Sequence, residues 1–258
     1  MRILLTNDDG VDSPGIRLLA DGLRKAGHRV VVIAPESDQS GVSHAIAFIN
    51  RPCKLTPMGE DTWACGGTPV DCVVVGLLGG LPEAFAMPHS PPDMVVSGVN
   101  RGANLGSDIL YSGTAAAARQ AALFNIPSAA FSLIEGDEWH WDMAAGFAVE
   151  RLDEVKAYWK PDSFVNVNMP NRREKPRALV HAFPSFRYYN DSIEIYRAPD
   201  GYRYCFARTG KIASRPERGS DDAVTAEGGA SVSEIYIHPA LLESVRERGG
   251  ENDGKSGQ

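Results

Sequence analysis

Residues 1–35 read MRILLTNDDGVDSPGIRLLADGLRKAGHRVVVIAP, and this stretch decides the class of fold. The apolar run at 2–6 predicts a buried strand, and Ser13-Pro14 supplies the N-cap and the first-turn proline of a helix. Apolar residues then recur at i, i+3, i+4 and i+7, which gives the helix one buried face. Because a second apolar run follows at 30–34, we predict two parallel strands joined by a right-handed helical crossover.

The alternation of strand and helix signals continues through the first two thirds of the chain. It predicts further strands over 94–96, 128–131 and 164–167, and helices from Thr68-Pro69, over 114–124 and over 140–158. We therefore predict an α/β fold with a Rossmann-like, doubly wound and mostly parallel sheet in three α/β/α layers.

The character of the sequence changes beyond Pro170. Short alternating stretches with many tyrosines, together with the turn signal Asp200-Gly201, predict an antiparallel β-hairpin arm within about 177–230. We predict a single domain over 1–258, with its core at about 1–176 plus the C-terminal segment, a terminal helix and a disordered polar tail at about 249–258. Exposed β-arms pair readily with another subunit, so we predict a homodimer or a homotetramer.

The composition narrows the class of protein. Of the 258 residues, 43% are hydrophobic and 23% charged, as in an ordinary globular protein, and the formal charge of −7 argues against long nucleic acid as the main ligand. No apolar run reaches the ~20 residues of a membrane span, and the N-terminal run is too short for a signal peptide. The four cysteines form no CxxC pair, so we expect reduced thiols in a cytoplasmic protein with no membrane partner.

Three polar loops follow predicted parallel strands at their C-terminal ends. They span residues 6–10, 35–44 and 97–106, and the third is followed closely by Tyr-Ser-Gly-Thr at 111–114. Open α/β sheets bind their ligands at this end of the strands. A small anion held here by a cation, a helix N-terminus or an arginine is compatible with the acidic chain.

The first loop carries two adjacent carboxylates, Asp8 and Asp9. Two like charges at a strand end repel each other unless a cation or hydrogen-bond donors lie between them. One interpretation is a divalent metal, Mg²⁺ or Mn²⁺, with positions left open for water and phosphate. The other is that the acidic side chains favour the dipole of the helix that follows, without any metal.

Neutral polar residues on the other two loops also have two interpretations, as ligands of a metal or phosphate and as ordinary turn or capping residues. Ser40 and Asn100 are oxygen donors that complete a metal shell without adding repulsion, although each alone is typical of a turn. Ser112-Gly113-Thr114 precedes an Ala-rich helix and forms either a phosphate cradle or a plain N-cap. Asn104, between two glycines, is placed to donate its amide to the same phosphate.

With these residues assembled, the chain resembles the SurE survival protein family of 5′(3′)-nucleotidases, also described as acid phosphatases. The resemblance rests on ordered segments that are listed here with their positions: MRILLTNDDGVDSPGI (1–16), APESDQSGVS (34–43), GGTPVDCV (66–73), VVSGVNRGANLGSDILYSGTAAAA (95–118) and NVNMP (166–170). It implies a Rossmann-like core, an oligomer joined by C-terminal arms, and a cytoplasmic protein.

The resemblance also implies the roles of individual residues. One divalent ion per subunit, Mg²⁺ or Mn²⁺, is expected on Asp8, Asp9, Ser40 and Asn100. The substrate phosphate is expected beside Gly41, Asn104, Ser112, Gly113 and Thr114.

We predict hydrolysis of nucleoside 5′-monophosphates, with 3′-monophosphates as a second substrate class. Asp8 and Asp9 are the predicted catalytic residues, and Asp9 is the predicted base that acts on water. Two alternatives stay open at this stage. One is a nucleotide-sugar-dependent glycosyltransferase-like protein, because strand, helix and Gly27 to Pro35 also open many such enzymes. The other is a metal- or nucleotide-binding module without turnover.

Overall fold

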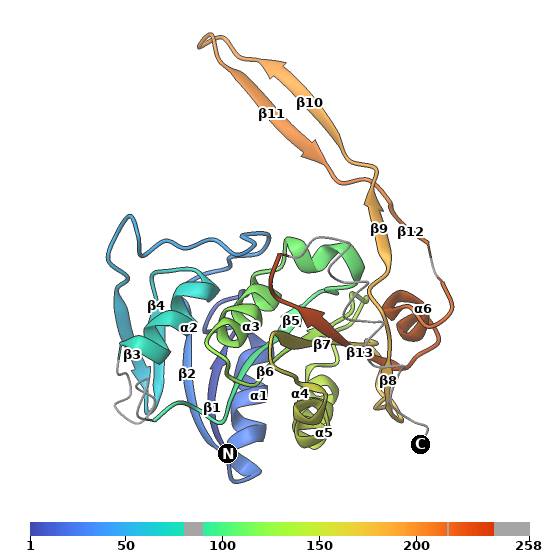
Figure 1. Cartoon of the computed structure of the whole chain (residues 1–258). Coiled ribbons are helices and arrows are strands. Elements are labelled where there is room, and N and C mark those ends of the chain that lie inside the picture. The colour runs from blue at the N-terminus through green and yellow to red at the C-terminus, as the bar shows by residue number, and fades with distance from the viewer. Residues whose placement is uncertain (80–89, 216, 240–258) are drawn as a thin grey trace.

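The computed structural model describes residues 1–79, 90–215 and 217–239, and a large sheet forms the body of the molecule (Figure 1). Its strands are β1 (Arg2–Thr6), β2 (Arg29–Pro35), β3 (Leu55–Gly59), β4 (Thr62–Cys65), β5 (Met94–Arg101), β6 (Ser128–Leu133), β7 (Ser163–Met169), β8 (Leu179–His181) and β13 (Ala230–Tyr236). Within the described ranges the sheet has nine strands in the order β3-β4-β2-β1-β5-β6-β7-β13-β8. The six from β4 to β7 are parallel, which confirms the predicted mostly parallel sheet.

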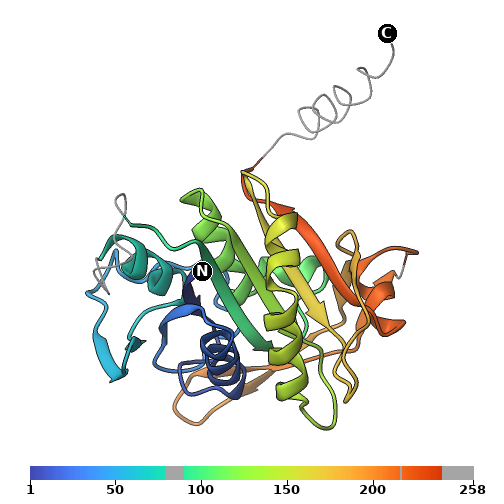
Figure 2. The ribbon, with the colours of Figure 1, turned by 90° about the horizontal axis from the view of Figure 1, so that it is seen from below.

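Helices cover both faces of this sheet (Figures 1 and 2). α1 (Pro14–Lys25), α4 (Trp141–Glu150) and α5 (Leu152–Tyr158) pack with Ile3 and Leu5 on one face. α2 (Pro69–Leu78) and α3 (Gly113–Leu123) pack with Leu4 on the other face. Alternate residues of β1 therefore enter opposite hydrophobic cores, as the period of a strand requires, and the predicted three layers are confirmed.

The chain reverses its direction of travel across the sheet between β1 and β5. β1 pairs in parallel with β2 on one side and with β5 on the other. The chain first builds outward through β2 and β4, and then returns to β5 and builds the other half through β6 and β7. The loops that leave β1 and β5 therefore meet at the topological switch point, where an open α/β sheet leaves a crevice for a ligand.

Several elements differ from the sequence-based expectation. The helix expected over 140–158 is divided into α4 and α5 at Arg151, whose guanidinium bonds Glu154 and the carbonyl of Arg177. The antiparallel β3–β4 pair was not predicted, because Pro57 and Gly59 weaken the strand signal at this edge. Nor was β13, which returns from the arm to pair antiparallel with β7.

The predicted arm projects from the body as two consecutive antiparallel ladders (Figure 1). β9 (Phe186–Tyr189) pairs with β12 (Ile212–Arg215) at its base, and β10 (Ser192–Arg197) pairs with β11 (Arg203–Arg208) beyond it. The distal hairpin turns at the predicted Asp200-Gly201, where Gly201 has a φ of 86°. A short helix, α6 (Asp221–Ala226), leads back into β13. The predicted terminal helix and the predicted disordered tail lie outside the described residues.

No helix in the described ranges is both long and apolar enough to cross a bilayer.

Helix α1 approaches strand β5 unusually closely at Gly15. A Cβ at this position would lie 2.0 Å from the carbonyl oxygen of Val99 and 3.1 Å from Cζ3 of Trp141. Only glycine allows this separation, so Gly15 sets how closely α1 packs against β5.

We expect Gly15→Ala to destabilise the protein by at least about 2 kcal/mol, because the added methyl must displace backbone. Gly22→Ala in the same helix is the matched control, since its Cβ would meet only the end of Val149 at 3.0 Å. The alanine gains helix propensity, so its free energy of unfolding should stay within about 1 kcal/mol of the native value. Urea unfolding of both variants checks this, and equal stabilities would contradict the close-packing argument.

Candidate functional site

The turn after β1 is held in shape by Asn7. Its fully buried amide donates to the carbonyl of Gly10 at 2.8 Å and to the hydroxyl of Ser13 at 2.8 Å. Gly10 has a φ of 97°, which glycine adopts without strain. Asn7 therefore braces the turn on which Asp8 and Asp9 lie.

Asp8 is buried against the N-terminus of α3. Its carboxylate accepts the backbone N–H of Thr114 at 3.0 Å and also the hydroxyl of Thr114 in a short contact. A Cβ at Gly113 would lie 2.8 Å from the Cβ of Asp8, so glycine is needed there. Burial raises the pKa of Asp8, the two bonds from Thr114 lower it, and the charge of Asp38 raises it further. Asp8 thus interacts with a helix N-terminus, but with that of α3 rather than that of α1, which follows it in sequence.

Asp9 lies beside the loop after β5. Its carboxylate accepts the backbone N–H of Arg101 at 2.9 Å. Burial, followed by the charge of Asp8, raises the pKa of Asp9 to about 6. The two neighbouring carboxylates are therefore poorly compensated by the protein itself.

The loop after β2 brings Ser40 and a third carboxylate to the same place. The N–H of Gln39 donates to the carbonyl of Asp8 at 2.7 Å, which ties this loop to the first one. Ser40 donates its N–H and its hydroxyl to Asp38, at 2.8 Å and 2.6 Å. Sequence analysis did not select Asp38, although an aspartate two residues before a serine is typical of an Asx turn. Its charge acts on both Asp8 and Asp9.

Asn100 reaches the site through an irregularity in β5. The β5–β6 register shifts between Ser97 and Asn100, and Gly98 has a φ of 130°. A Cβ on Gly98 would lie 2.3 Å from the carbonyl oxygen of Phe131, so no other residue fits. The amide nitrogen of the buried Asn100 donates to the carbonyl of Gly102 at 2.8 Å, which leaves its amide oxygen as the donor for a cation.

Asn104 is held by two fully buried asparagines of β7. Its N–H donates to Asn168 at 2.8 Å, and its carbonyl accepts the amides of Asn166 and Asn168 at 2.9 Å and 3.1 Å. Its own side-chain amide donates to Ser132 at 2.8 Å, so one amide hydrogen remains for a phosphate. The asparagines at 166 and 168 therefore act as a clamp on the loop backbone.

The start of α3 combines capping with the predicted phosphate role. The hydroxyl of Ser112 accepts the N–H of Ala115 at 2.9 Å, so the N-cap interpretation of Ser112 is confirmed. Thr114 is engaged with Asp8, as described above. The N–H of Gly113 is the group left to face a ligand at this helix end.

Two adjoining cavities open onto these residues. The first has a volume of about 280 Å³, and its lining includes Asp8, Ser40, Gly41, Asn100, Arg101, Asn104, Asp108, Ser112, Arg187 and Tyr189. The second, of about 370 Å³, is lined by Asp9, Ser13, Pro14, Asp38, Ser40, Arg101 and Trp141. The structure therefore brings the predicted site residues together, with Gly113 and Thr114 directly behind Asp8.

The base of the arm also reaches the first cavity. Arg187 and Tyr189 of β9 line it and both bond Asp108, Arg187 at 2.6 Å and Tyr189 through its hydroxyl. The sequence around Arg187 and Tyr189 does not indicate that they line the site. They reach it because β9 packs against the loop before α3, a contact between segments far apart in the sequence.

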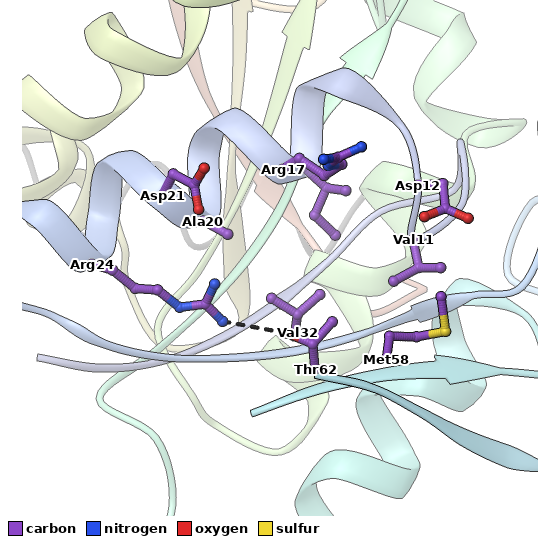
Figure 3. Close-up of a pocket in the computed structure, with 10 residues that line it drawn as sticks. Val11, Asp12, Arg17, Ala20, Asp21, Arg24, Val32, Met58 and Thr62 are labelled. Carbon is purple, nitrogen blue, oxygen red and sulfur yellow. Dashed lines mark hydrogen bonds between the residues drawn. The ribbon is translucent and has the colours of Figure 1, made fainter. Parts of the chain in front are cut away.

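A further cavity of about 350 Å³ lies between α1 and the edge formed by β2 and β4 (Figure 3). Arg24 reaches across it and donates to the hydroxyl of Thr62 at 3.4 Å, and Asp12, Arg17 and Asp21 lie around it. None of the predicted site residues lines this cavity, so the candidate site remains at the switch point.

Comparisons with known proteins place these observations in a family. The family description "Survival protein SurE" matches residues 3–189. A protein of Geotalea daltonii named 5′-nucleotidase SurE is 39% identical over 248 residues, which cover 95% of this chain and 96% of that one. One of the same name from Xanthomonas euvesicatoria is 44% identical over 174 residues, 66% of this chain and 64% of that one. The crystal structure of the SurE protein from Aquifex aeolicus superposes with a TM-score of 0.80 at 32% identity, covering 98% of this chain and 100% of that one.

We expect Asp9→Asn to stabilise the protein in EDTA by about 1–2 kcal/mol at pH 7.5, because it removes a partly buried, repelled charge. The folded-state pKa lies above the unfolded value of 3.8 and reaches about 6, so the cost of ionising Asp9 grows as pH rises through that window. The advantage of Asp9→Asn should therefore vanish near pH 3.8 and be complete above pH 6. Urea unfolding across this range measures it, with the exposed Asp12→Asn as control; a pH-independent difference would contradict the assignment.

Proposed function

Because the chain belongs to the SurE family, we propose that it is a divalent-metal-dependent 5′-nucleotidase with its active site at the β1–β5 switch point. Relatives named 5′-nucleotidase SurE that share 39–44% of aligned residues with this chain support the activity. The observation that carries the site is that Asp8, Ser40 and Asn100 line one cavity at the N-terminus of α3, while Asp9 and Asp38 line the adjoining cavity. Carboxylates suit a divalent cation and a helix N-terminus suits an anion, so the two together suit a phosphate bound beside a metal ion.

The residues present fit a hard divalent ion. Asp8 and Asp9 offer carboxylates, Ser40 a hydroxyl and Asn100 an amide oxygen, which are the ligands that Mg²⁺ and Mn²⁺ prefer. Burial raises the pKa of both Asp8 and Asp9, and a bound cation would favour their charged forms. The oxygen Oδ1 of Asn7 is also buried without a partner among the described residues. We assign one ion per subunit to this set.

The reaction is attack of water on a phosphoryl group, which breaks the ester bond to the nucleoside and releases inorganic phosphate. A bound metal ion polarises the phosphoryl oxygens and increases the acidity of water. Asp8, held by Thr114, would serve as a fixed ligand of the ion. Asp9 accepts the proton of the attacking water, and the departing nucleoside oxygen takes up a proton from solvent. The N–H of Gly113, the amide of Asn104 and the hydroxyl of Ser112 bind the non-bridging oxygens and stabilise their charge in the transition state.

The substrate class proposed here is nucleoside 5′-monophosphates, with 3′-monophosphates as a second class. Neither of the other hypotheses has a specific observation in its favour. A glycosyltransferase-like protein leaves the carboxylate cluster without a use, and a binding module predicts ligand binding without phosphate release. Cytoplasmic location stays a prediction from the sequence.

The arm supports a homo-oligomer. Every residue of β11 is exposed, and large apolar side chains on the distal hairpin, such as Ile193, Ile195 and Phe206, are each more than half exposed. An isolated two-stranded ribbon is marginally stable in water, and exposed apolar surface of this kind marks protein interfaces. We assign the distal hairpin to contacts between subunits of a homodimer or homotetramer.

Asp8→Asn should lower phosphate release from nucleoside monophosphates by at least about 100-fold, because a metal ligand is lost. EDTA-stripped native protein should be inactive until Mg²⁺ or Mn²⁺ is restored. A colorimetric phosphate assay measures both, and Asp21→Asn, an exposed position on α1, controls for loss of a carboxylate. Native-like activity of Asp8→Asn, or activity that EDTA does not reduce, would overturn the proposed site.

Replacing residues 191–209 by Gly-Gly should convert the oligomer to a monomer. The backbones at 190 and 210 are adjacent, since a Cβ at Gly210 would lie 1.8 Å from the carbonyl oxygen of Asn190, so the β9–β12 ladder can close. Light scattering coupled to size exclusion gives the mass, and circular dichroism confirms folding. An unchanged oligomer mass would contradict the assignment of the hairpin.

A further inference from the structure

A layered stack of side chains stands beside the candidate site. The rings of Trp139 and Trp141 stack with centroids 5.1 Å apart and planes 12° apart. The guanidinium of Arg101 lies over the ring of Trp139, with Cζ 5.2 Å from its centroid. Arginine over indole is the most favourable form of cation–π contact and restricts the guanidinium to one plane.

The stack is fixed at its far end by the body of the protein. Both tryptophans pack against the hydrophobic core, and Trp141 lies where Gly15 of α1 has no side chain. The loop that carries Trp139 is braced by Asn171, which accepts the N–H of His140 at 3.1 Å and donates to the carbonyl of Glu138 at 2.7 Å. The aromatic platform is therefore positioned before any ligand arrives.

Arg101 itself lies between the two cavities of the site. Arg101 lines both cavities. Its backbone N–H donates to the carboxylate of Asp9, and its positive charge lowers the pKa of Asp9. It forms no salt bridge within the described part of the chain, whereas Arg187, the other arginine of the first cavity, is paired with Asp108 at 2.6 Å. The exposed guanidinium of Arg101 thus retains the donors on its edge for an anion.

We propose that Arg101 binds the phosphate of the nucleotide substrate and that Trp139 is the positioning residue that holds it there. A guanidinium stacked through its face leaves its edge for two parallel N–H···O bonds, the geometry that matches a phosphate. Lysine carries the same charge but has neither the planar fork nor the stacking surface. The inference rests on the proposed function, because it takes the switch-point cavities as the place of phosphate binding.

The first test is the split between KM and kcat in metal-loaded protein with a nucleoside monophosphate as substrate. Arg101→Ala should raise KM and the inhibition constant of inorganic phosphate by about 10- to 100-fold, as expected for loss of hydrogen bonds to a charged group. Arg101→Lys should recover only part of this loss. Arg17→Ala removes the same charge from the separate cavity of Figure 3 and should leave both constants unchanged.

The second test addresses Trp139. Trp139→Leu should raise KM by about three- to fivefold, because it removes the ring but not the guanidinium. Trp139→Phe keeps an aromatic face and should restore most of the affinity. If the ring acts through Arg101, the double variant Arg101→Ala with Trp139→Leu should be no worse than Arg101→Ala alone.

Two results would overturn the assignment. An unchanged KM and phosphate inhibition constant in Arg101→Ala would remove Arg101 from substrate binding. A further loss when Trp139→Leu is added to Arg101→Ala would show that the ring acts independently of the guanidinium. Asp8→Asn distinguishes failure of this inference from failure of the proposed function. If Asp8→Asn is inactive and Arg101→Ala is native-like, this inference alone fails. If Asp8→Asn stays active, the proposed function fails as well.

Discussion

The hydrogen bonds between Asp8 and Thr114 join the end of the first strand to the start of a helix more than 100 residues later. They place a buried carboxylate against a helix N-terminus, and they leave its neighbour Asp9 beside a second like charge. Burial and repulsion between carboxylates cost free energy in the isolated protein, a cost that a cation offsets. The loops after β2 and β5 are arranged around this pair, so the geometry of the site follows from how Asp8 is held.

Buried polar side chains hold the loops around Asp8 and Asp9 in place. Asn7 braces the first turn, and Asn166 and Asn168 hold the backbone at Asn104. Asp221 of α6 accepts the N–H groups of Gly106 and Ser185, at 2.7 Å and 2.9 Å, and so ties the loop before α3 to the base of the arm. The amide nitrogens of these three asparagines and the carboxylate of Asp221 all bond backbone groups, and such bonds hold the loops in one conformation.

The arm gives the same chain two different kinds of surface. Its base, with Arg187 and Tyr189, lines the first cavity of the candidate site, while its distal hairpin exposes apolar side chains. The distal hairpin and the cavity wall are therefore parts of one β-ribbon, β9–β12 followed by β10–β11.

The sequence by itself determined the parallel sheet, its three layers and the loops that carry Asp8, Asp9, Ser40 and Asn100. Strand and helix periods are local, and loops at the C-terminal ends of parallel strands necessarily meet at one edge. The tertiary structure alone decided that Asp38 orients Ser40, that Asn166 and Asn168 hold Asn104, and that Trp139 underlies Arg101. It also decided that β13 closes on β7. These contacts join residues from separate elements, and nothing in the local composition of either partner specifies the other.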